Sequence, residues 1–460
     1  MDETDLPYVE IDPEKCKSCA GCVLDCPKNV LFIGEEFNTS GYNFAQYAGE
    51  GCTGCAACYY ACPDNAICVF RKGAEPAATE SRGLESVLTQ DSVPMNPRLR
   101  DLLLESVTGP RFVEGNDAVV YGALLAGCEL FFGYPITPAS EISHLSAELY
   151  PSIGNTLGSR HCFLQAESEV AAINMLYGAA SAGARCMTAT SSPGFSLMTE
   201  GISYAAATEL PMVIVDLMRG GPGLGNVAPS QEDFHQLTKG GGHGNYKNIV
   251  LSPNSVQEMC DLTMLAFDLA FVYRNPVIVA TDGAIGHTRE SVVFPEPVKQ
   301  LMTTPWALEG TAETRRNLIT SIFLSPPELE ERCIRLEEKF RRMEENEVRF
   351  ETYNTEGAVL VLVAYGIVSR MLESVMEKLK GEVNIGLIRP ITLWPFPSEA
   401  VREHTAHADN VLVVELNNGQ MVDDVRAATH RPVHFHGRMG GVLPTERELA
   451  DIILEVMHHG

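Results

Sequence analysis

The stretch CKSCAGCVLDCP at residues 16–27 returns as CTGCAACYYACP at residues 52–63, and the two copies decide how the chain begins. Each copy has the spacing C-x-x-C-x-x-C-x-x-x-C-P. Eight thiolates in this double arrangement are what two 4Fe–4S clusters require, and the fourth cysteine of each copy ligates the other cluster. We therefore assign one cluster to Cys16, Cys19, Cys22 and Cys62, and the second to Cys52, Cys55, Cys58 and Cys26.

Structural zinc and disulfides are the alternatives for these cysteines. Zinc also takes four thiolates, but its sites usually show two C-x-x-C pairs and not two triplets that each end in Cys-Pro. Disulfides are typical of small secreted domains, and this chain is neither small nor secreted in pattern. The motif therefore predicts an electron-transfer module in a reducing, cytoplasmic compartment.

The composition of the chain narrows the function further. Its 460 residues are enough for about three domains. The formal net charge of −26 argues against a nucleic-acid partner, because phosphate binding needs clustered lysine and arginine. No uninterrupted apolar run is long enough to span a membrane, and the acidic start resembles no secretory signal, so we expect no membrane association.

The organisation of the chain follows from changes in pattern. Apolar strands alternate with helices rich in small residues after residue 109, and most of these strands are continuously apolar, which predicts a parallel sheet covered on both faces. A charged stretch with helical spacing of its apolar residues predicts one helix packed across a domain boundary, with a coiled-coil seam as the weaker alternative. We predict a cluster module at 1–72, a linker at 73–108, an α/β domain at 109–305, a connecting helical segment at 306–354 and a second α/β domain at 355–460.

Three residues besides the cysteines are candidates for a role in binding or catalysis. Thr137, in GYPITP at 133–138, follows a strand and should reach the edge of the sheet where ligands bind in open α/β folds, although a rigid capped turn is the simpler alternative. Glu169 begins an otherwise apolar helix, either as a poorly solvated acid or as a first-turn acid favoured by the helix dipole. Arg219 ends a buried strand before a glycine-rich loop, where it can hold a carboxylate bidentately or lie on the surface.

Read together, these motifs resemble the α-type subunit of the 2-oxoacid:ferredoxin oxidoreductases. The resemblance covers about three quarters of the chain and rests on GYPITP (133–138), QAESEVAAINMLYGAASAGA (165–184), TATSSPGFSLMTEG (188–201), MRGGPGLGNVAPSQEDF (218–234) and TDGAIG (281–286). The cluster module is similar to the two-cluster δ-type subunit of the same enzymes. The resemblance implies a ferredoxin-like α+β domain, then a pyrimidine-type thiamine-binding α/β domain, then an α/β domain like the C-terminal one of transketolase.

The resemblance also implies the chemistry and the site. That family oxidatively decarboxylates a 2-oxoacid on thiamine diphosphate, gives the electrons to iron–sulfur clusters and ferredoxin, and joins the acyl group to coenzyme A. Glu169 matches the glutamate that protonates N1′ of the cofactor's aminopyrimidine, and Pro135 and Ile136 lie in the motif that contacts the cofactor. Thr137 and Arg219 match residues that bind the substrate carboxylate.

The absence of a diphosphate-binding motif predicts a partner subunit. The diphosphate of thiamine needs Mg²⁺ held by a GDG-type motif with a downstream asparagine, and the chain has only Thr281-Asp282-Gly283, in the wrong place. The cofactor's diphosphate and Mg²⁺ must therefore be held by a β-type partner subunit, with a γ-type subunit as a candidate third component. Glu169 should then reach the cofactor across an interface.

The substrate is expected to be a branched-chain 2-oxoacid such as 2-oxoisovalerate. The loop sequence RGGPGLGNVAPSQ (219–231) resembles that of the branched-chain members of the family. Residues 220–238 contain no lysine or arginine, so this segment has no cation to bind a second carboxylate. His235 and Lys239 keep 2-oxoglutarate open as the alternative substrate. A non-catalytic electron-transfer subunit and a non-redox thiamine enzyme are the competing functions.

Overall fold

The computed structural model describes residues 8–24, 26, 28–52, 58, 62, 66–70, 92–94, 111–298, 300–380 and 383–459. The chain divides into two compact units, Met1–Glu85 and Ser86–Gly460, and each is described by itself. Most of the predicted linker at 73–108 lies outside the described residues. Within the described part of the chain, no helix is both long enough and apolar enough to cross a membrane.

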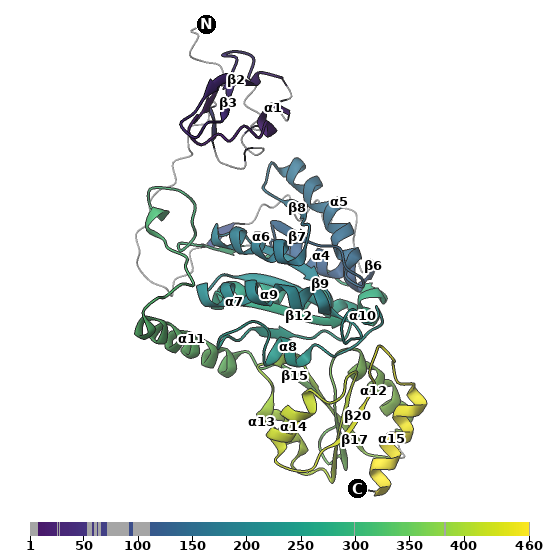
Figure 1. The fold of residues 1–460 in the computed structure, drawn as a ribbon. Helices are drawn as coiled ribbons and strands as arrows, with labels where there is room; N and C mark the ends of the chain where they lie inside the picture. The colour runs from purple at the N-terminus through teal and green to yellow at the C-terminus, as the bar shows by residue number, and fades with distance from the viewer. Residues whose placement is uncertain are drawn as a thin grey trace. The chain divides into compact units, whose positions relative to one another are not determined.

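The described residues of the first unit form short strands and one short helix (Figure 1). β1 (Tyr8–Ile11) pairs antiparallel with β4 (Ile67–Phe70), and β2 (Leu31–Phe37) pairs antiparallel with β3 (Asn43–Tyr47). The helix α1 (Gly21–Leu24) lies inside the first cysteine motif. Elements this short bury little apolar surface, so a unit of this kind depends on bound metal for its stability.

Asn38 fastens the loop that carries the first cysteine motif. Its side-chain amide donates to the carbonyls of Pro13 at 2.8 Å and Cys16 at 2.9 Å. Its side-chain oxygen accepts from the N–H groups of Ser40 and Tyr42 at 3.1 and 2.9 Å. One buried side chain thus joins the turn between β2 and β3 to the first cysteine of the motif.

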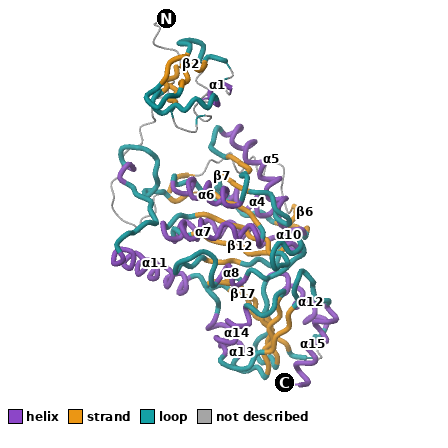
Figure 2. Tube along the Cα trace, viewed as in Figure 1, coloured by secondary structure: helices purple, strands orange, loops and turns teal. Residues whose placement is uncertain are grey.

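The second unit is built on a seven-stranded sheet with helices packed along it (Figures 1 and 2). The strand order is β18-β11-β12-β10-β9-β7-β8, and all neighbours are parallel except β11 and β18. The strands are β7 (Leu130–Gly133), β8 (Cys162–Gln165), β9 (Cys186–Thr190), β10 (Met212–Met218), β11 (Ile249–Leu251), β12 (Pro276–Asp282) and β18 (Thr392–Trp394).

The continuously apolar strands lie at the centre of this sheet. Every residue of β9, β10 and β12 is buried. Because successive side chains of a strand point to opposite faces, both faces must be covered there. The covering helices are α4 (Gly115–Leu125), α5 (Ser140–Leu157), α6 (Glu169–Ser181), α7 (Ser192–Thr208) and α9 (Val256–Tyr273), of which α4 packs on α9 and α6 on α7.

A second sheet of five strands follows in the order β15-β17-β16-β19-β20. Only β15 is antiparallel to its neighbour. Its strands are β15 (Phe350–Tyr353), β16 (Leu360–Val363), β17 (Ile385–Pro390), β19 (Asn410–Glu415) and β20 (His434–Gly437), and its helices are α12 (Gly366–Lys378), α13 (Ser398–Thr405), α14 (Met421–Thr429) and α15 (Glu446–His459). β15 belongs to this sheet although it precedes residue 355, where we predicted the domain to begin.

Short elements complete the second unit. β6 (Arg111–Glu114) pairs with β13 (Arg289–Val292), and β5 (Ser92–Pro94), inside the predicted linker, pairs with β14 (Gln300–Met302). The short helices are α8 (Phe234–Thr238), α10 (Gly283–His287) and the 3₁₀ turn η2 (Thr314–Arg316).

The charged stretch forms one helix, α11 (Pro326–Asn346). Its apolar residues recur at helical spacing from Leu329 to Met343. Leu336, Phe340 and Met343, in the second half of this stripe, are buried. Leu329 and Cys333, in the first half, are exposed. Polar contacts therefore hold much of this helix in place.

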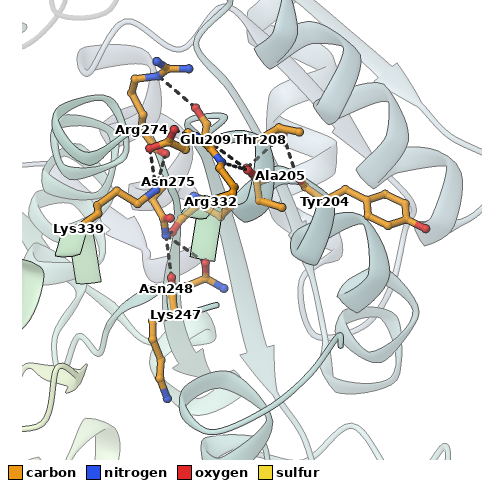
Figure 3. Close-up of polar contacts among 12 residues, drawn as sticks. Tyr204, Ala205, Thr208, Glu209, Lys247, Asn248, Arg274, Asn275, Arg332 and Lys339 are labelled. Atoms are coloured by element: carbon orange, nitrogen blue, oxygen red, sulfur yellow. Dashed lines mark hydrogen bonds and ion pairs between the residues drawn. The ribbon is translucent and has the colours of Figure 1, made fainter. Parts of the chain in front are cut away.

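Those contacts converge on Glu209, the residue that ends α7 (Figure 3). Arg332 and Lys339 of α11 lie 2.6 and 3.5 Å from its carboxylate oxygens. Arg274, which ends α9, donates to the Glu209 carbonyl at 3.2 Å, and Lys339 donates to the Arg274 carbonyl at 3.2 Å. Burial lowers the pKa of Lys339 to about 8, against the opposing effect of Glu209.

Replacing Glu209 by glutamine should destabilise the second unit by roughly 2–4 kcal/mol, because one carboxylate serves several cations and partly buried charges lose their partner. Urea unfolding followed by tryptophan fluorescence measures this, since both tryptophans, Trp306 and Trp394, are in this unit. The cost should shrink as the pH is raised from about 7 to above 8, because Lys339 is then neutral in both proteins.

The matched control for that measurement is Glu399→Gln, which removes a 2.8 Å ion pair to Arg402 between side chains that are 76% and 56% exposed. Exposed pairs contribute about 0–1 kcal/mol. Equal destabilisation by the two substitutions would contradict the role given to Glu209.

Candidate functional site

The predicted site residues of the second unit follow strands that end at one edge of the large sheet. β7, β9, β10 and β12 run parallel, so their carboxyl ends meet there. Thr137 follows β7, Ser191 follows β9 and Arg219 follows β10. Ligands of open α/β sheets bind outside this edge.

Arg219 and Thr137 are in direct contact. The Arg219 guanidinium donates from Nη1 to the Thr137 carbonyl at 2.8 Å and from Nη2 to the Leu224 carbonyl at 3.1 Å. Its Nε–H is buried and has no partner among the described residues. Arg219 is only 9% exposed, which excludes the alternative of a surface arginine in a mobile loop. The guanidinium has five N–H donors and these two hydrogen bonds use two of them, so donors remain for a ligand.

The loop that leads from β7 to Thr137 is exposed to solvent. Pro135 and Thr137 are exposed and Ile136 is half-buried. Arg219 binds the main-chain carbonyl of Thr137, so the Thr137 side chain takes no part in this contact and is exposed. The structure therefore brings the arginine and the threonine together at the carboxyl edge, where their positions after two predicted strands placed each of them.

Glu169 lies at the junction of α6, β9 and α7. It is the first residue of α6, is 5% exposed, and follows Ser168, whose hydroxyl accepts from the Ala171 N–H at 3.2 Å. A Cβ added to Gly194 of α7 would lie 2.7 Å from the Glu169 carboxylate and 2.2 Å from the Thr190 hydroxyl. Glycine at 194 is therefore required for α7 to begin this close to the acid.

The residues below Glu169 on its helix also match the predicted apolar face: Ala172, Ile173, Leu176 and Ala180 are buried. The Thr190 hydroxyl beside it is buried without a partner in the described part of the chain. The carboxylate thus sits in a small, nearly dry recess at a helix N-terminus. A group in such a place can exchange a proton with a ligand that enters the recess.

A cavity of about 450 Å³ lies beside Arg219. The cavity lies between the glycine-rich loop after Arg219 and the part of the chain that carries the five-stranded sheet. Glu232 bridges these two parts, because its carboxylate accepts from the Gly221 N–H at 2.6 Å and from the Gly440 N–H at 3.0 Å. Its lining includes Ser192, Gly220, Asp233, Gln420 and Met439. A larger hollow of about 700 Å³, beside Tyr353 and Lys380, contains none of the predicted site residues.

Ser192, Asp216 and Asp233 are polar residues of this site that the sequence analysis missed. Asp216 stood out only as an acid inside the apolar run PMVIVDLM at 211–218, and it is fully buried on β10. Ser192 and Asp233 are 41 residues apart and meet only in the folded chain. The buried acid in an apolar strand was the one available signal.

The cysteines of the first unit gather in its core. Cys16, Cys22, Cys26 and Cys58 are buried, Cys52 and Cys62 are half-buried and Cys19 is exposed. Cys55 lies outside the described residues. No disulfide joins the cysteines whose side chains are described.

Four of these thiols are neighbours. Burial, and then the proximity of Cys16, Cys19 and Cys62, raises the pKa of Cys22 to about 11. The Ala45 N–H donates to Cys16 Sγ at 3.4 Å. Cys22 and these three neighbours are the four cysteines that the sequence assigned to one cluster. Among the described residues, no group of three or more His, Cys, Asp or Glu side chains is arranged to hold a single metal ion. Crowded, buried thiols fit a cationic metal centre, which favours the thiolate form.

Models of three protein families match the chain. The family described as pyruvate flavodoxin/ferredoxin oxidoreductase, thiamine diphosphate-binding, matches residues 121–354. The pyruvate:ferredoxin oxidoreductase core domain II matches residues 358–449, and a 4Fe-4S dicluster domain matches residues 10–66.

Individual proteins are similar over most of the second unit. A ketoisovalerate oxidoreductase subunit, VorB, of Methanothermobacter thermautotrophicus is 54% identical over 75% of this chain and 97% of its own length. A 2-oxoglutarate synthase subunit, KorA, of Archaeoglobus fulgidus is 44% identical over 68% of this chain and 90% of its own. The solved 2-oxoglutarate:ferredoxin oxidoreductase from Magnetococcus marinus, with 2-oxoglutarate, coenzyme A and succinyl-CoA bound, matches with a TM-score of 0.69 at 27% identity, over 76% of this chain and 66% of that one.

Proposed function

This chain belongs to the 2-oxoacid:ferredoxin oxidoreductase family and is an oxidoreductase subunit with its own 4Fe–4S domain, and from that membership we propose that its substrate is a branched-chain 2-oxoacid. The reaction converts 2-oxoisovalerate and coenzyme A to the acyl-CoA and CO₂, and it delivers two electrons to ferredoxin. The observation that carries the proposal is the meeting of Arg219 and Thr137 at the same sheet edge as the recessed acid Glu169.

The residues at this edge fit thiamine diphosphate. Glu169, in its recess beside Gly194, holds and returns a proton at N1′ of the aminopyrimidine, and Pro135 and Ile136 contact the cofactor. The bound cofactor supplies a carbanion that adds to the oxo group and accepts the electrons left by decarboxylation. Arg219, which lines the cavity with N–H donors to spare, and Thr137 orient the substrate carboxylate.

The diphosphate and its Mg²⁺ belong to a β-type partner subunit. Asp282, the acid of the chain's Thr-Asp-Gly sequence, is fully buried and accepts from the N–H groups of Ala284 and Ile285 at 2.9 and 3.2 Å. An acid committed to capping α10 is unsuited to holding Mg²⁺ at a diphosphate. A γ-type subunit is a further candidate component of the complex.

Exposed apolar side chains around Glu169 support an interface there. They lie directly after β7 and on β8, α6 and α7, elements that pack on one another. Tyr134, Leu164, Val170 and Leu197 are between 37% and 54% exposed. Large apolar side chains grouped in this way mark protein–protein contact surfaces. We therefore place the active site between this chain and its partner, which makes the isolated chain inactive.

The first unit carries two 4Fe–4S clusters. One is held by Cys16, Cys19, Cys22 and Cys62, and the second by Cys52, Cys55, Cys58 and Cys26. The proximity of Cys62 to the first three thiols supports this exchange of the fourth ligand between motifs. Clusters held by these thiolates would supply one-electron carriers between the reaction and ferredoxin.

The substrate preference tests the proposal. The complex with its native partner, purified anaerobically, should reduce a viologen dye in a CoA-dependent reaction, with kcat/KM about 100-fold higher for 2-oxoisovalerate than for 2-oxoglutarate. A pocket without a cation for the second carboxylate would bury that charge unpaired. Pyruvate, which fills less of an apolar pocket, should fall between them.

Two outcomes would contradict this reading. Preference for 2-oxoglutarate would keep the reaction class and reverse the substrate. No turnover on any of the three acids, with intact clusters, would favour a non-catalytic electron-transfer subunit.

A further inference from the structure

Two aspartates with no role in the chemistry above lie beneath the loop that carries Arg219. Asp216, on β10, is fully buried, and neither of its carboxyl oxygens has a hydrogen-bond donor among the described residues. Asp233 precedes α8, is 8% exposed and lines the 450 Å³ cavity. A buried carboxyl group without a donor is costly unless it holds a proton or faces a second group that does.

Hydrogen bonds join Asp233 to the main chain of Arg219 through one serine. The Arg219 N–H donates to Ser192 Oγ at 3.0 Å, and the Ser192 hydroxyl donates to Asp233 Oδ2. The hydroxyl's other acceptor, the Arg219 carbonyl, is farther away at 3.4 Å. A carboxylate is the stronger acceptor, so the hydroxyl proton belongs to Asp233. The arginine backbone is thereby fixed to a buried negative charge.

The two aspartates interact in a way that favours a proton on Asp216. Burial raises the pKa of Asp216 well above its usual range, and the negative charge of Asp233 raises it further. Two carboxyl groups that face each other without an intervening donor do not both ionise. Asp216 therefore keeps the proton near neutral pH, and Asp233 carries the charge.

The surroundings of Asp233 are consistent with that division. Burial raises the pKa of Asp233 to about 6, the hydrogen bond from Ser192 lowers it, and the charge of Glu232 raises it. The positive charge of Arg219 lowers it as well, and Tyr365 is the other titratable side chain that faces this acid. Asp233 is thus the member of the pair that is stabilised as the anion.

We propose that Asp233 is a positioning residue for substrate binding: through Ser192 it holds the Arg219 main chain so that the guanidinium, which lines the cavity, presents its remaining N–H donors to the carboxylate of the 2-oxoacid. This inference rests on the proposed function, because it takes Arg219 as the carboxylate-binding group. Substitutions in this chain of hydrogen bonds keep the guanidinium group and Glu169 chemically intact, but they release the main chain that positions the guanidinium. Affinity for the 2-oxoacid should therefore fall while the rate of the bound substrate is kept.

Ser192→Ala, tested in the complex with the native partner, is the first variant. It should raise the KM for 2-oxoisovalerate about tenfold, the effect of losing one hydrogen bond to a charged group. The kcat and the KM for coenzyme A should change less than about twofold. Ser196→Ala is the matched control: Ser196 is one turn further along α7, and its hydroxyl bonds Gln236 and the Ser192 carbonyl but neither Arg219 nor Asp233. Its KM should stay within about twofold of the unmodified complex.

The aspartates themselves supply a second, chemical test. Asp233→Ala should raise the KM for 2-oxoisovalerate by about tenfold or more. Asp233→Asn keeps an oxygen for the Ser192 hydroxyl and should recover most of that loss. Asp216→Asn donates an N–H to Asp233 in place of the carboxyl proton, and it should remain within about threefold of the unmodified complex.

Three results would overturn the proposal: equal KM values for Ser192→Ala and Ser196→Ala, a fall in kcat with KM unchanged, or an Asp233→Asn variant as impaired as Asp233→Ala. If the unmodified complex turns over none of the 2-oxoacids, the proposed function fails and this inference fails with it. If the unmodified complex is active and Ser192→Ala matches it, only the positioning role fails.

Discussion

Replacing Glu169 by glutamine should lower the kcat of the complex about 10²–10⁴-fold, the range for removing a positioned acid–base group. The amide keeps the size of the side chain in its recess beside Gly194, but it cannot hold or return a proton at N1′ of the cofactor. The KM for 2-oxoisovalerate should change little, because Arg219 and Thr137 are untouched. CoA-dependent viologen reduction at saturating thiamine diphosphate measures both constants.

The control for this substitution is Glu167→Gln. Glu167 lies two positions earlier, before the same helix, and is exposed. Its kcat should equal that of the unmodified complex. Equal losses in the two variants, or a loss in Glu169→Gln that excess cofactor restores, would show that Glu169 acts in binding or folding and not in proton transfer.

Replacing Cys22 by alanine should cut electron delivery to ferredoxin by 10–100-fold or more, since changes around metal ligands already have effects of that size. Cys22 is buried and its thiol is adjacent to those of Cys16, Cys19 and Cys62. About half of the iron and acid-labile sulfide should be lost, because one cluster of two depends on this residue. Iron analysis and low-temperature EPR of the reduced complex check the loss.

The same variant separates the two units of the chain. Release of CO₂ in a single turnover needs no exported electron, so Cys22→Ala should retain it. Cys333→Ala, which removes an exposed thiol from α11, should affect neither measurement. Full iron content in Cys22→Ala would contradict the ligand assignment, and loss of CO₂ release would indicate that the first unit is needed for the chemistry itself.

The fold class was predictable because its signals are local, and the family match confirms it. β9, β10 and β12 are continuous apolar runs, which only a sheet covered on both faces can bury. The apolar face below Glu169 repeats at helical spacing. The cysteine motif needs nothing beyond its own spacing to indicate iron–sulfur clusters.

Features that depend on pairing between distant segments were not predictable. α11 was expected as one helix packed across a domain boundary, but the spacing did not show that Leu329 and Cys333 would be exposed while Arg332 and Lys339 pair with Glu209 of a distant segment. The link from Asp233 through Ser192 to Arg219 joins residues from three elements, and no spacing in the sequence encodes it. The predicted roles of the site residues stay predictions until the variants are measured.

The strand β18 has a consequence for how this molecule can be rearranged. Residues 392–394 pair with β11 and so form the edge of a sheet whose other strands come from residues 130–282. A chain cut between its two α/β regions would leave β11 with unpaired N–H and C=O groups, an edge open to any other strand. The two regions are thus consecutive in the gene but interlocked in space, and neither is a module that recombination can exchange alone.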